Sequence, residues 1–130
     1  MDKEKAIPYG LKITFLVHVI VGGIFGLAYL LIPKVITIMM GFSGGEPALS
    51  LFRVIGAAIL GYAASSWFCY RQTQWERVKI VVQMEIVWTI LGALASAWGV
   101  VSGALPATGW MNVIILAAFA IAFIAFYSRK

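Results

Sequence analysis

The sequence predicts an all-α, polytopic membrane protein: a single-domain bundle of four transmembrane helices, with a short interfacial helix between the first two spans. Hydrophobic residues make up 62% of the 130 residues and charged residues only 12%, with a mean hydropathy of +0.96. This composition lies outside the usual range of soluble domains. Because one span needs about 20 apolar residues, the chain has room for about four spans and short loops, and we expect no separate soluble domain.

Four apolar runs correspond to these spans: residues 11–32, 49–70, 78–101 and 109–127. Each run is near the length that crosses about 30 Å at 1.5 Å per residue. The first run follows a basic start, but it is longer than the hydrophobic core of a signal peptide, about 7 to 15 residues. We therefore expect it to be retained as the first span.

Residues near three of the run borders carry helix-start signals. Pro47 suits the first turn of the second helix. Thr73 followed by Glu76 predicts a capping box at the start of the third helix. Thr108 is placed to cap the fourth helix.

The link between the first two runs is predicted to contain the interfacial helix. After Pro33, the less apolar Lys34, Thr37 and Gly41 recur at spacings of three and four, and apolar residues fill the other positions. Residues 43–45 then give a flexible turn. A re-entrant filter is the alternative for this glycine-rich segment, but backbone at that depth needs shelter from protein.

The charges beside the runs predict the orientation of the chain in the cell membrane. Eight of the ten Lys and Arg residues lie before or at the start of the first run, between the second and third runs or at the start of the third, or after the fourth, whereas Lys34 and Arg53 lie on the opposite side. By the positive-inside rule, both termini and the middle connection then face the cytoplasm. This placement accounts for the net charge of +5, so we expect the lipid bilayer, and no nucleic acid, as a partner.

Stripes of small and polar residues at helical spacing predict the faces that point into the bundle, because such residues let membrane helices approach closely. The fourth run has only Asn112 of this kind and is expected to supply packing surface. The stripes are Thr14, His18, Gly22, Gly26 and Tyr29 in the first run, Ser50, Arg53, Ala57, Gly61 and Ala64 in the second, and Glu85, Thr89, Gly92, Ser96, Gly99 and Gly103 in the third.

Depth along the helices predicts a candidate polar site. His18 and Glu85 both lie roughly 10 Å from the cytoplasmic boundary, and Ser65 of the second span lies at a similar height. Trp88 lies roughly 15 Å deep, so we expect it to pack in the bundle or to wall a cavity. Arg53 lies near the opposite boundary, about 14 Å from Glu85 along the membrane normal, and is expected to anchor there rather than to pair with Glu85.

An ionisable residue inside a span is a functional hypothesis by default, because burying its charge is costly. Glu85 is either a structural carboxyl, neutral or hydrogen-bonded to His18, or a site for an ion or proton. His18 is either half of a structural hydrogen bond between helices or the partner of Glu85 in titration. Arg53 is an interfacial anchor, able to reach Glu46.

The sequence argues against an enzyme, a metal site and a cofactor. A zinc site needs three or four Cys, His or carboxylate ligands, whereas the chain has one histidine and one cysteine, Cys69. Ser-His-Asp catalysis lacks an acid in the spans other than Glu85. The glycines occur as membrane packing motifs and form no phosphate-binding loop.

One part of the sequence resembles a known group. The stretch from Pro33 to Gly41, then residues 51–57 and Gly61, resembles the small, uncharacterised prokaryotic four-helix membrane proteins gathered as DoxX-like. The resemblance covers about the second quarter of the chain and supports the four-helix fold. Arg53 and Gly56 match the recurrent pattern of the group, which implies no particular chemistry.

Two functions are consistent with these observations. The first is a non-enzymatic accessory or assembly subunit that binds another membrane protein or a copy of itself. The second is a proton-linked transporter or channel for a small solute, in which His18 and Glu85 titrate and Trp88 walls a cavity. A hydrated crevice that reaches Glu85 would favour transport, and a dry, close-packed centre would favour the subunit.

Overall fold

The computed structural model describes residues 5–42 and 44–129, and this part of the chain is helical apart from short connections. Four of its helices are long and apolar enough to cross a membrane, which confirms the predicted helical class and number of span-like helices. Their ends lie within three residues of the predicted runs. In chain order the elements are α1 (Tyr9–Leu31), α2 (Pro33–Met39), α3 (Glu46–Tyr70), the 3₁₀ helix η1 (Trp75–Arg77), α4 (Lys79–Val101) and α5 (Gly109–Tyr127).

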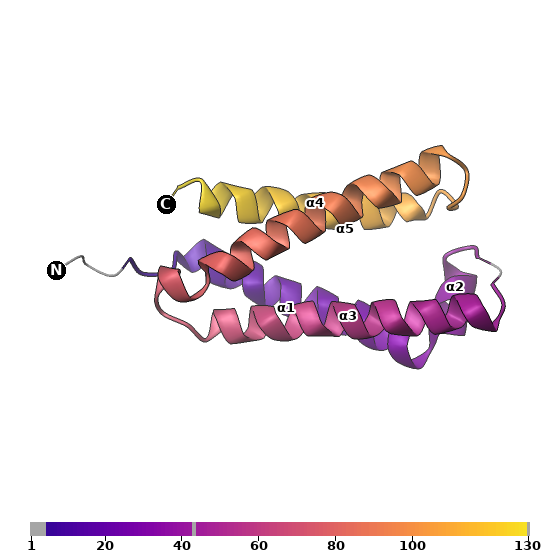
Figure 1. Cartoon of the computed structure of the whole chain (residues 1–130), viewed down its shortest axis with the longest axis horizontal. Helices are drawn as coiled ribbons and strands as arrows, with labels where there is room; N and C mark the ends of the chain where they lie inside the picture. Colours follow the sequence, from indigo (N-terminus) through magenta and orange to yellow (C-terminus); the bar gives the residue numbers. More distant parts are fainter. Residues whose placement is uncertain (1–4, 43, 130) are drawn as a thin grey trace.

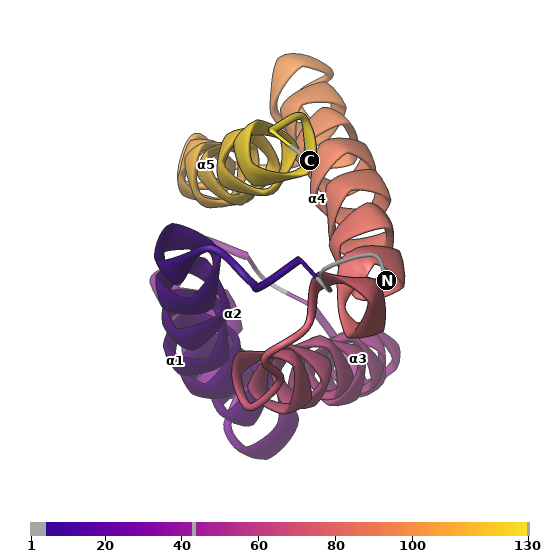
Figure 2. The ribbon, with the colours of Figure 1, turned by 90° about the vertical axis from the view of Figure 1, so that its left-hand side faces the viewer.

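The four long helices form two antiparallel pairs. Helix α1 packs along α3, and α4 packs along α5, while the described residues make far fewer contacts between the pairs. Figure 1 shows the pairs close together at the end that holds both termini and η1, which we call the terminal end. They diverge toward the opposite end, called the α2 end. Seen from the terminal end, the helices surround a common axis in the order α1, α3, α4, α5 (Figure 2).

A hydrophobic core holds the two pairs together at the terminal end. The rings of Phe15 on α1 and Phe123 on α5 lie 5.6 Å apart, and both side chains are fully buried. The segment before α1 forms an antiparallel bridge with the α3–α4 connection, at Ala6 and Gln74. The core comprises Ile7, Leu11, Phe15, Cys69, Trp75, Val78, Val82, Phe119 and Phe123.

The α1–α3 contact confirms most of the predicted stripe on α1. Gly22 and Gly26 are buried against α3. On α3, Gly56 lies so close to α1 that an added Cβ would be 2.7 Å from the Leu30 amide nitrogen and 2.8 Å from the Gly26 carbonyl oxygen. Only glycine therefore fits at position 56 without moving backbone.

The predicted inward face of α3 is wrong. The buried face contains Gly56 and Ala63, whereas the expected Ala57 and Ala64 follow each of them by one position and are exposed. One residue corresponds to about 100° around a helix. Small residues occur on both faces, and the close approach of α1 to Gly56 determines which face is buried. The other expected positions, Ser50, Arg53 and Gly61, are exposed as well.

The predicted stripe on α4 is correct except at its last position. Glu85 and Thr89 are fully buried. Farther along, Gly92 faces Leu116 of α5, where an added Cβ would lie at 2.9 Å. Ser96 accepts a hydrogen bond from Asn112 of α5, and Gly99 packs against Leu105. Gly103 is exposed and outside the bundle. It follows the end of α4 with φ +78°, a backbone conformation that glycine adopts without strain.

The helix starts differ in detail from the expected caps. Pro47 lies in the first turn of α3, as predicted. The capping box is wrong, because α4 begins after Val78 with no side-chain cap, and Glu76 instead pairs with Lys79. Thr108 precedes α5, but its hydroxyl donates to the carbonyl of Met40 at 2.6 Å. The helix predicted after Pro33 is present as α2, and its position in a membrane interface stays a prediction.

Candidate functional site

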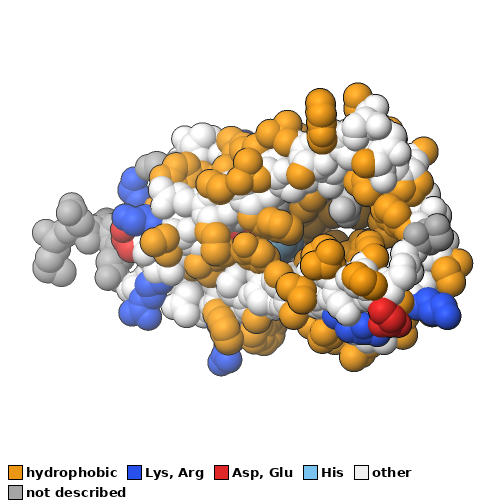
Figure 3. Space-filling model, turned by 45° about the vertical axis from the view of Figure 1, so that its right-hand side comes forward, with side chains coloured by type: hydrophobic (Ala, Val, Ile, Leu, Met, Phe, Trp, Pro, Cys, Tyr) orange, Lys and Arg blue, Asp and Glu red, His pale blue; other side chains and the backbone are white. Residues whose placement is uncertain are grey.

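A crevice lies between the two helix pairs, between the core at the terminal end and the α2 end. The space in it that the centre of a water molecule can occupy is about 100 Å³. Figure 3 shows the molecule hollowed between its two halves toward the α2 end. The residues lining the crevice are His18, Val21, Gly22, Phe25 and Tyr29 of α1, Ile55 and Ile59 of α3, Trp88 of α4, and Asn112, Ile115, Leu116 and Phe119 of α5.

Three buried polar side chains meet where the crevice ends on His18, and we call them the polar triad: His18, Ser66 and Glu85. His18 Nδ1 lies 2.7 Å from Ser66 Oγ, and Ser66 Oγ donates to Glu85 Oε1 at 3.4 Å. The direct distance from His18 Nδ1 to Glu85 Oε1 is 3.6 Å. Ser66 and Glu85 are 0% exposed and His18 is 6% exposed. Helices α1, α3 and α4 thus each supply one member.

Helical spacing explains why each member points inward. His18 follows Phe15 by three residues on the buried face of α1, Ser66 follows Ala63 by three on α3, and Glu85 follows Val82 by three on α4. Residues three or four apart share one side of a helix. Each polar side chain is therefore carried inward by the same face that carries the apolar core.

The two ends of the polar triad are chemically different. Because Nδ1 of His18 faces Ser66 and the ring lines the crevice, Nε2 is the nitrogen that remains for the crevice. Among the described residues, Nε2 has no hydrogen-bond partner. At the other end, Glu85 Oε2 is buried and also has no partner among these residues. The triad therefore connects an available imidazole nitrogen to a buried, half-satisfied carboxyl group.

This geometry forms a continuous route for one proton. The Ser66 hydroxyl donates to Glu85 and is within hydrogen-bond distance of His18 Nδ1. Since Ser66 donates its only proton to Glu85, Nδ1–H of the neutral His18 donates to Ser66 Oγ and Nε2 can bind a further proton. The Nδ1 proton can then pass to Ser66 Oγ as the Ser66 proton passes to an ionised Glu85 Oε1. Histidine suits the first position because its two ring nitrogens can bind and release protons on opposite sides.

Aromatic rings surround the histidine. The ring centroids of His18 and Phe119 lie 4.8 Å apart, and those of His18 and Phe123 lie 6.0 Å apart, both in edge-to-face arrangements. Thr89, one turn after Glu85, donates its hydroxyl to the backbone carbonyl of Glu85 at 2.6 Å. It therefore does not bond the Glu85 carboxyl group. Apolar packing thus separates the polar triad from the terminal end.

The structure brings together two of the predicted site residues and adds Ser66 to them. His18 and Glu85, predicted to lie at one depth, meet in the polar triad. Ser65, predicted at a similar height, lies near Glu85 and donates its hydroxyl to the Tyr62 carbonyl at 2.7 Å, but its neighbour Ser66 is the serine that bonds His18. Ser66 was missed because it lies on the face of α3 that was not expected to be buried. The spacing from Gly56 through Ala63 to Ser66 was the signal that identifies this serine.

The other two predicted site residues lie apart from the polar triad. Trp88 lines the crevice, where it stacks on Tyr62 with ring centroids 4.9 Å apart and planes 7° from parallel. The expectation of a cavity wall is consistent with this position. Arg53 is exposed, with its guanidinium 3.8 Å from the Glu46 carboxylate, the partner expected for it. The crevice itself, and the part that Asn112 takes in its wall, were not predicted.

Comparisons with protein-family models, with curated protein sequences and with solved structures gave no match to this chain. The resemblance of residues 33–61 to the DoxX-like group therefore stays a prediction. Any function has to be argued from the crevice and the polar triad.

Proposed function

We propose that this chain is an integral membrane protein that moves a small solute across the bilayer together with a proton. The polar triad is the proton site, and the crevice is the solute site. One observation carries the proposal: the crevice ends on His18, which is connected through Ser66 to the buried Glu85. No catalytic step is part of this function.

The orientation is part of the proposal. The termini and the α3–α4 connection lie in the cytoplasm, because Lys and Arg concentrate beside them. The crevice then faces the outer half of the membrane, and the core around Phe15 and Phe123 closes the inner half. Reporter fusions after Ser128 and within residues 71–77 should report the cytoplasm. Labelling of residues 71–77 by an impermeant reagent from outside would overturn this orientation.

Protonation of Glu85 offers a physical basis for coupling. Losing a hydrogen-bond partner costs more free energy for an ionised carboxylate in a low-dielectric bundle than for a neutral carboxyl group. A proton delivered through His18 and Ser66 therefore lowers the cost of separating the two helix pairs at the terminal end. Release of that proton to the other side would restore the present arrangement.

Glu85→Gln tests the proposal, because it preserves the shape and hydrogen bonding of the side chain and removes its proton binding. Infrared spectroscopy of the protein in lipid nanodiscs should show a carboxyl band that changes with pH in the wild type and is absent in Glu85→Gln. In proteoliposomes that contain a pH dye, at least one solute from a panel of small aromatic and non-aromatic molecules should drive proton flux in the wild type and not in Glu85→Gln. Glu76→Gln, at an exposed carboxyl paired with Lys79, is the matched control and should retain the flux.

The opposite outcome is equally specific. If Glu85→Gln keeps the behaviour of the wild type while Glu85→Leu misfolds, the carboxyl group is structural and the transport proposal is wrong. Equal melting temperatures of Glu85→Gln and wild type would show that a loss of flux is not a loss of folding.

A second candidate is the accessory or assembly subunit, favoured by the outward face of α3. Gly61 there has open space around it, with nothing within 4 Å of an added Cβ, and Ala57 and Ala64 are exposed beside it. Small residues on an outer face allow another membrane helix to approach closely. Native mass spectrometry from detergent should then show an oligomer of the wild type. Gly61→Trp should dissociate this oligomer, whereas Gly23→Trp, on α1, should leave it intact.

A further inference from the structure

We infer that the crevice binds an uncharged aromatic molecule with one hydrogen-bonding group, whose ring packs among aromatic walls and whose polar group meets His18 Nε2. This inference rests on the proposed function, since it names the class of solute for the same site. It is argued from the walls, the floor and the charge of the crevice.

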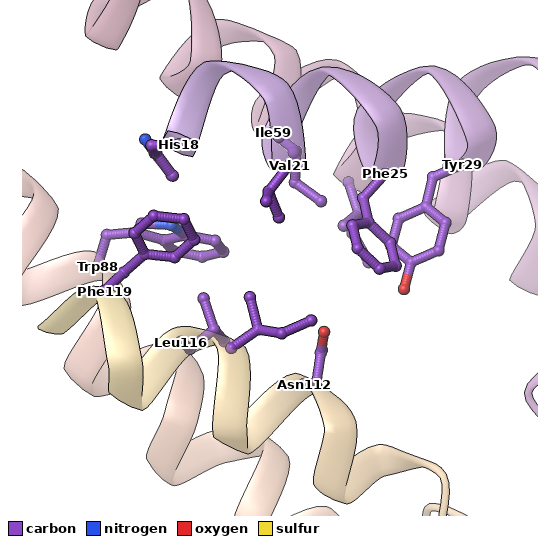
Figure 4. Close-up of a pocket in the computed structure, with 12 residues that line it drawn as sticks. His18, Val21, Phe25, Tyr29, Ile59, Trp88, Asn112, Leu116 and Phe119 are labelled. Carbon is purple, nitrogen blue, oxygen red and sulfur yellow. The ribbon is translucent and has the colours of Figure 1, made fainter. Parts of the chain in front are cut away.

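Four of the twelve residues that line the crevice are Phe, Tyr or Trp. Phe25, Tyr29, Trp88 and Phe119 come from three different helices and all line the crevice. Figure 4 shows these four rings around the cavity, with His18 at one end. Aromatic rings favour offset-stacked or edge-to-face partners. Aromatic side chains that line the crevice on several sides therefore fit a planar ring better than a flexible chain.

The floor supplies one unsatisfied polar atom. His18 is 6% exposed, and its Nε2 has no partner among the described residues. Unlike Glu85 Oε2, Nε2 is not fully buried, so a ligand in the crevice can reach it and form its hydrogen bond. Because Ser66 donates its one hydroxyl proton to Glu85, Nδ1 donates to Ser66 Oγ, and Nε2 of the neutral histidine is an acceptor. A hydroxyl group on the ligand, which can donate to Nε2, is therefore suitable.

The opposite end of the crevice adds polar groups without charge. In Figure 4 the side-chain oxygen of Asn112 and the hydroxyl of Tyr29 both point toward the cavity. Their other hydrogen bonds are weak: Tyr29 Oη donates to the thioether sulfur of Met40 at 3.5 Å, a weak acceptor, and Asn112 Nδ2 donates to Ser96 Oγ at a long 3.5 Å. A ligand with its hydroxyl at His18 thus leaves its far edge beside two weak hydrogen-bonding groups.

Charge excludes ions as the preferred occupant. The twelve residues given above as lining the crevice include no Asp, Glu, Lys or Arg. Glu85 is 0% exposed and lies behind His18, and Arg53 is turned outward to Glu46. A charged ligand would lose its hydration with no counter-ion to replace it. A lipid tail would satisfy the apolar walls, but it would leave His18 Nε2 without a partner.

The test uses 2-naphthol and naphthalene as probes, with the protein in lipid nanodiscs and binding followed by probe fluorescence. The two probes share a planar ring and differ by one hydroxyl group. We expect 2-naphthol to bind saturably and about tenfold more tightly than naphthalene, the effect of one net hydrogen bond. Equal binding of the two probes, or no saturable binding of 2-naphthol, would overturn the inference.

Two histidine variants locate the hydrogen bond. His18→Asn keeps a polar group near the position of Nδ1, so it can still bond Ser66, but it has nothing at Nε2. It should bind 2-naphthol no better than naphthalene. His18→Gln places its amide near the position of Nε2 and should keep part of the preference. If both variants retain the full preference, the hydroxyl does not meet His18 and the inference is wrong.

A second pair of variants locates the ring. Leu116→Trp fills the crevice and should abolish the binding of both probes. Leu94→Trp makes the same change on an outer face of α4, where Leu94 is exposed, and should have no effect. Saturable binding that survives Leu116→Trp would place the probe elsewhere. Naphthol binding without proton flux would refute the proposed transport alone, and proton flux driven only by other solutes would refute this inference alone.

Discussion

The two ends of the bundle are built differently from the same four helices. At the terminal end, the fully buried Phe15 and Phe123 bring the helix pairs into contact. At the α2 end the pairs diverge, and the described contact between them there includes a loop bond from Thr108 to Met40 and the approach of Gly41 to Pro106. Each pair is held internally by close helix packing, whereas side chains at one end determine how the pairs meet. Opening at the α2 end therefore costs less than opening at the terminal end.

The largest effect is expected from Phe15→Ala compared with Phe25→Ala. Removing the Phe15 ring leaves a cavity in a closed core and should lower the free energy of unfolding by about 3 kcal/mol or more. Phe25 lines a space that is already empty, so its loss should cost far less. Steric-trapping measurements of unfolding in bicelles would give both values. Equal losses of unfolding free energy in the two variants would show that both ends are equally well packed and that the two ends do not differ in this way.

A smaller effect is expected where α1 meets α3. In Gly56→Ala the added Cβ meets the backbone of Leu30 and Gly26, and overpacking of this kind costs about 1 to 3 kcal/mol. Gly61→Ala puts the same methyl group into open space and should change the stability by less than about 0.5 kcal/mol. The same unfolding assay measures both. A larger loss of stability in Gly61→Ala than in Gly56→Ala would show that the buried face of α3 is the one predicted from the sequence.

The smallest effect is expected at the loops of the α2 end. Thr108→Val removes the hydroxyl that donates to Met40 and should cost about 1 kcal/mol, while the spacing of the two loops widens. Electron paramagnetic resonance between spin labels on the α2–α3 and α4–α5 loops would report that spacing. Ser102→Ala is the control, because its hydroxyl bonds within its own helix end, to Gly99. An unchanged distance in Thr108→Val would mean that other contacts hold the loops.

The helices were predictable because each one is marked by a long run of apolar residues, in which no single residue decides the result. Each span needs about 20 apolar residues, so single errors do not move it far, and the structure starts and ends the long helices within three residues of the predicted runs. Equal depth also identified His18 and Glu85 as possible partners. Depth depends only on counting residues along straight helices.

Rotation about a helix axis was much less predictable. Gly56, Ala57, Ala63 and Ala64 give α3 two adjacent faces of small residues, and hydropathy alone does not separate them. The choice is made by the backbone of α1, through its approach to Gly56. The omission of Ser66 follows from that rotation. The crevice depends on the angle between helix pairs, which no local pattern in the sequence specifies.

The bridge between Ala6 and Gln74 has a consequence for biosynthesis. Its backbone bonds run from the Ile7 amide to the Thr73 carbonyl at 3.1 Å and from the Trp75 amide to the Lys5 carbonyl at 2.8 Å. Residues 5–7 leave the ribosome before their partners, which emerge only after all of α3 has been made. Such non-local contacts form late, because the intervening chain must first be ordered. Residues 5–7 therefore cannot form this bridge until residues 73–75 have been synthesised.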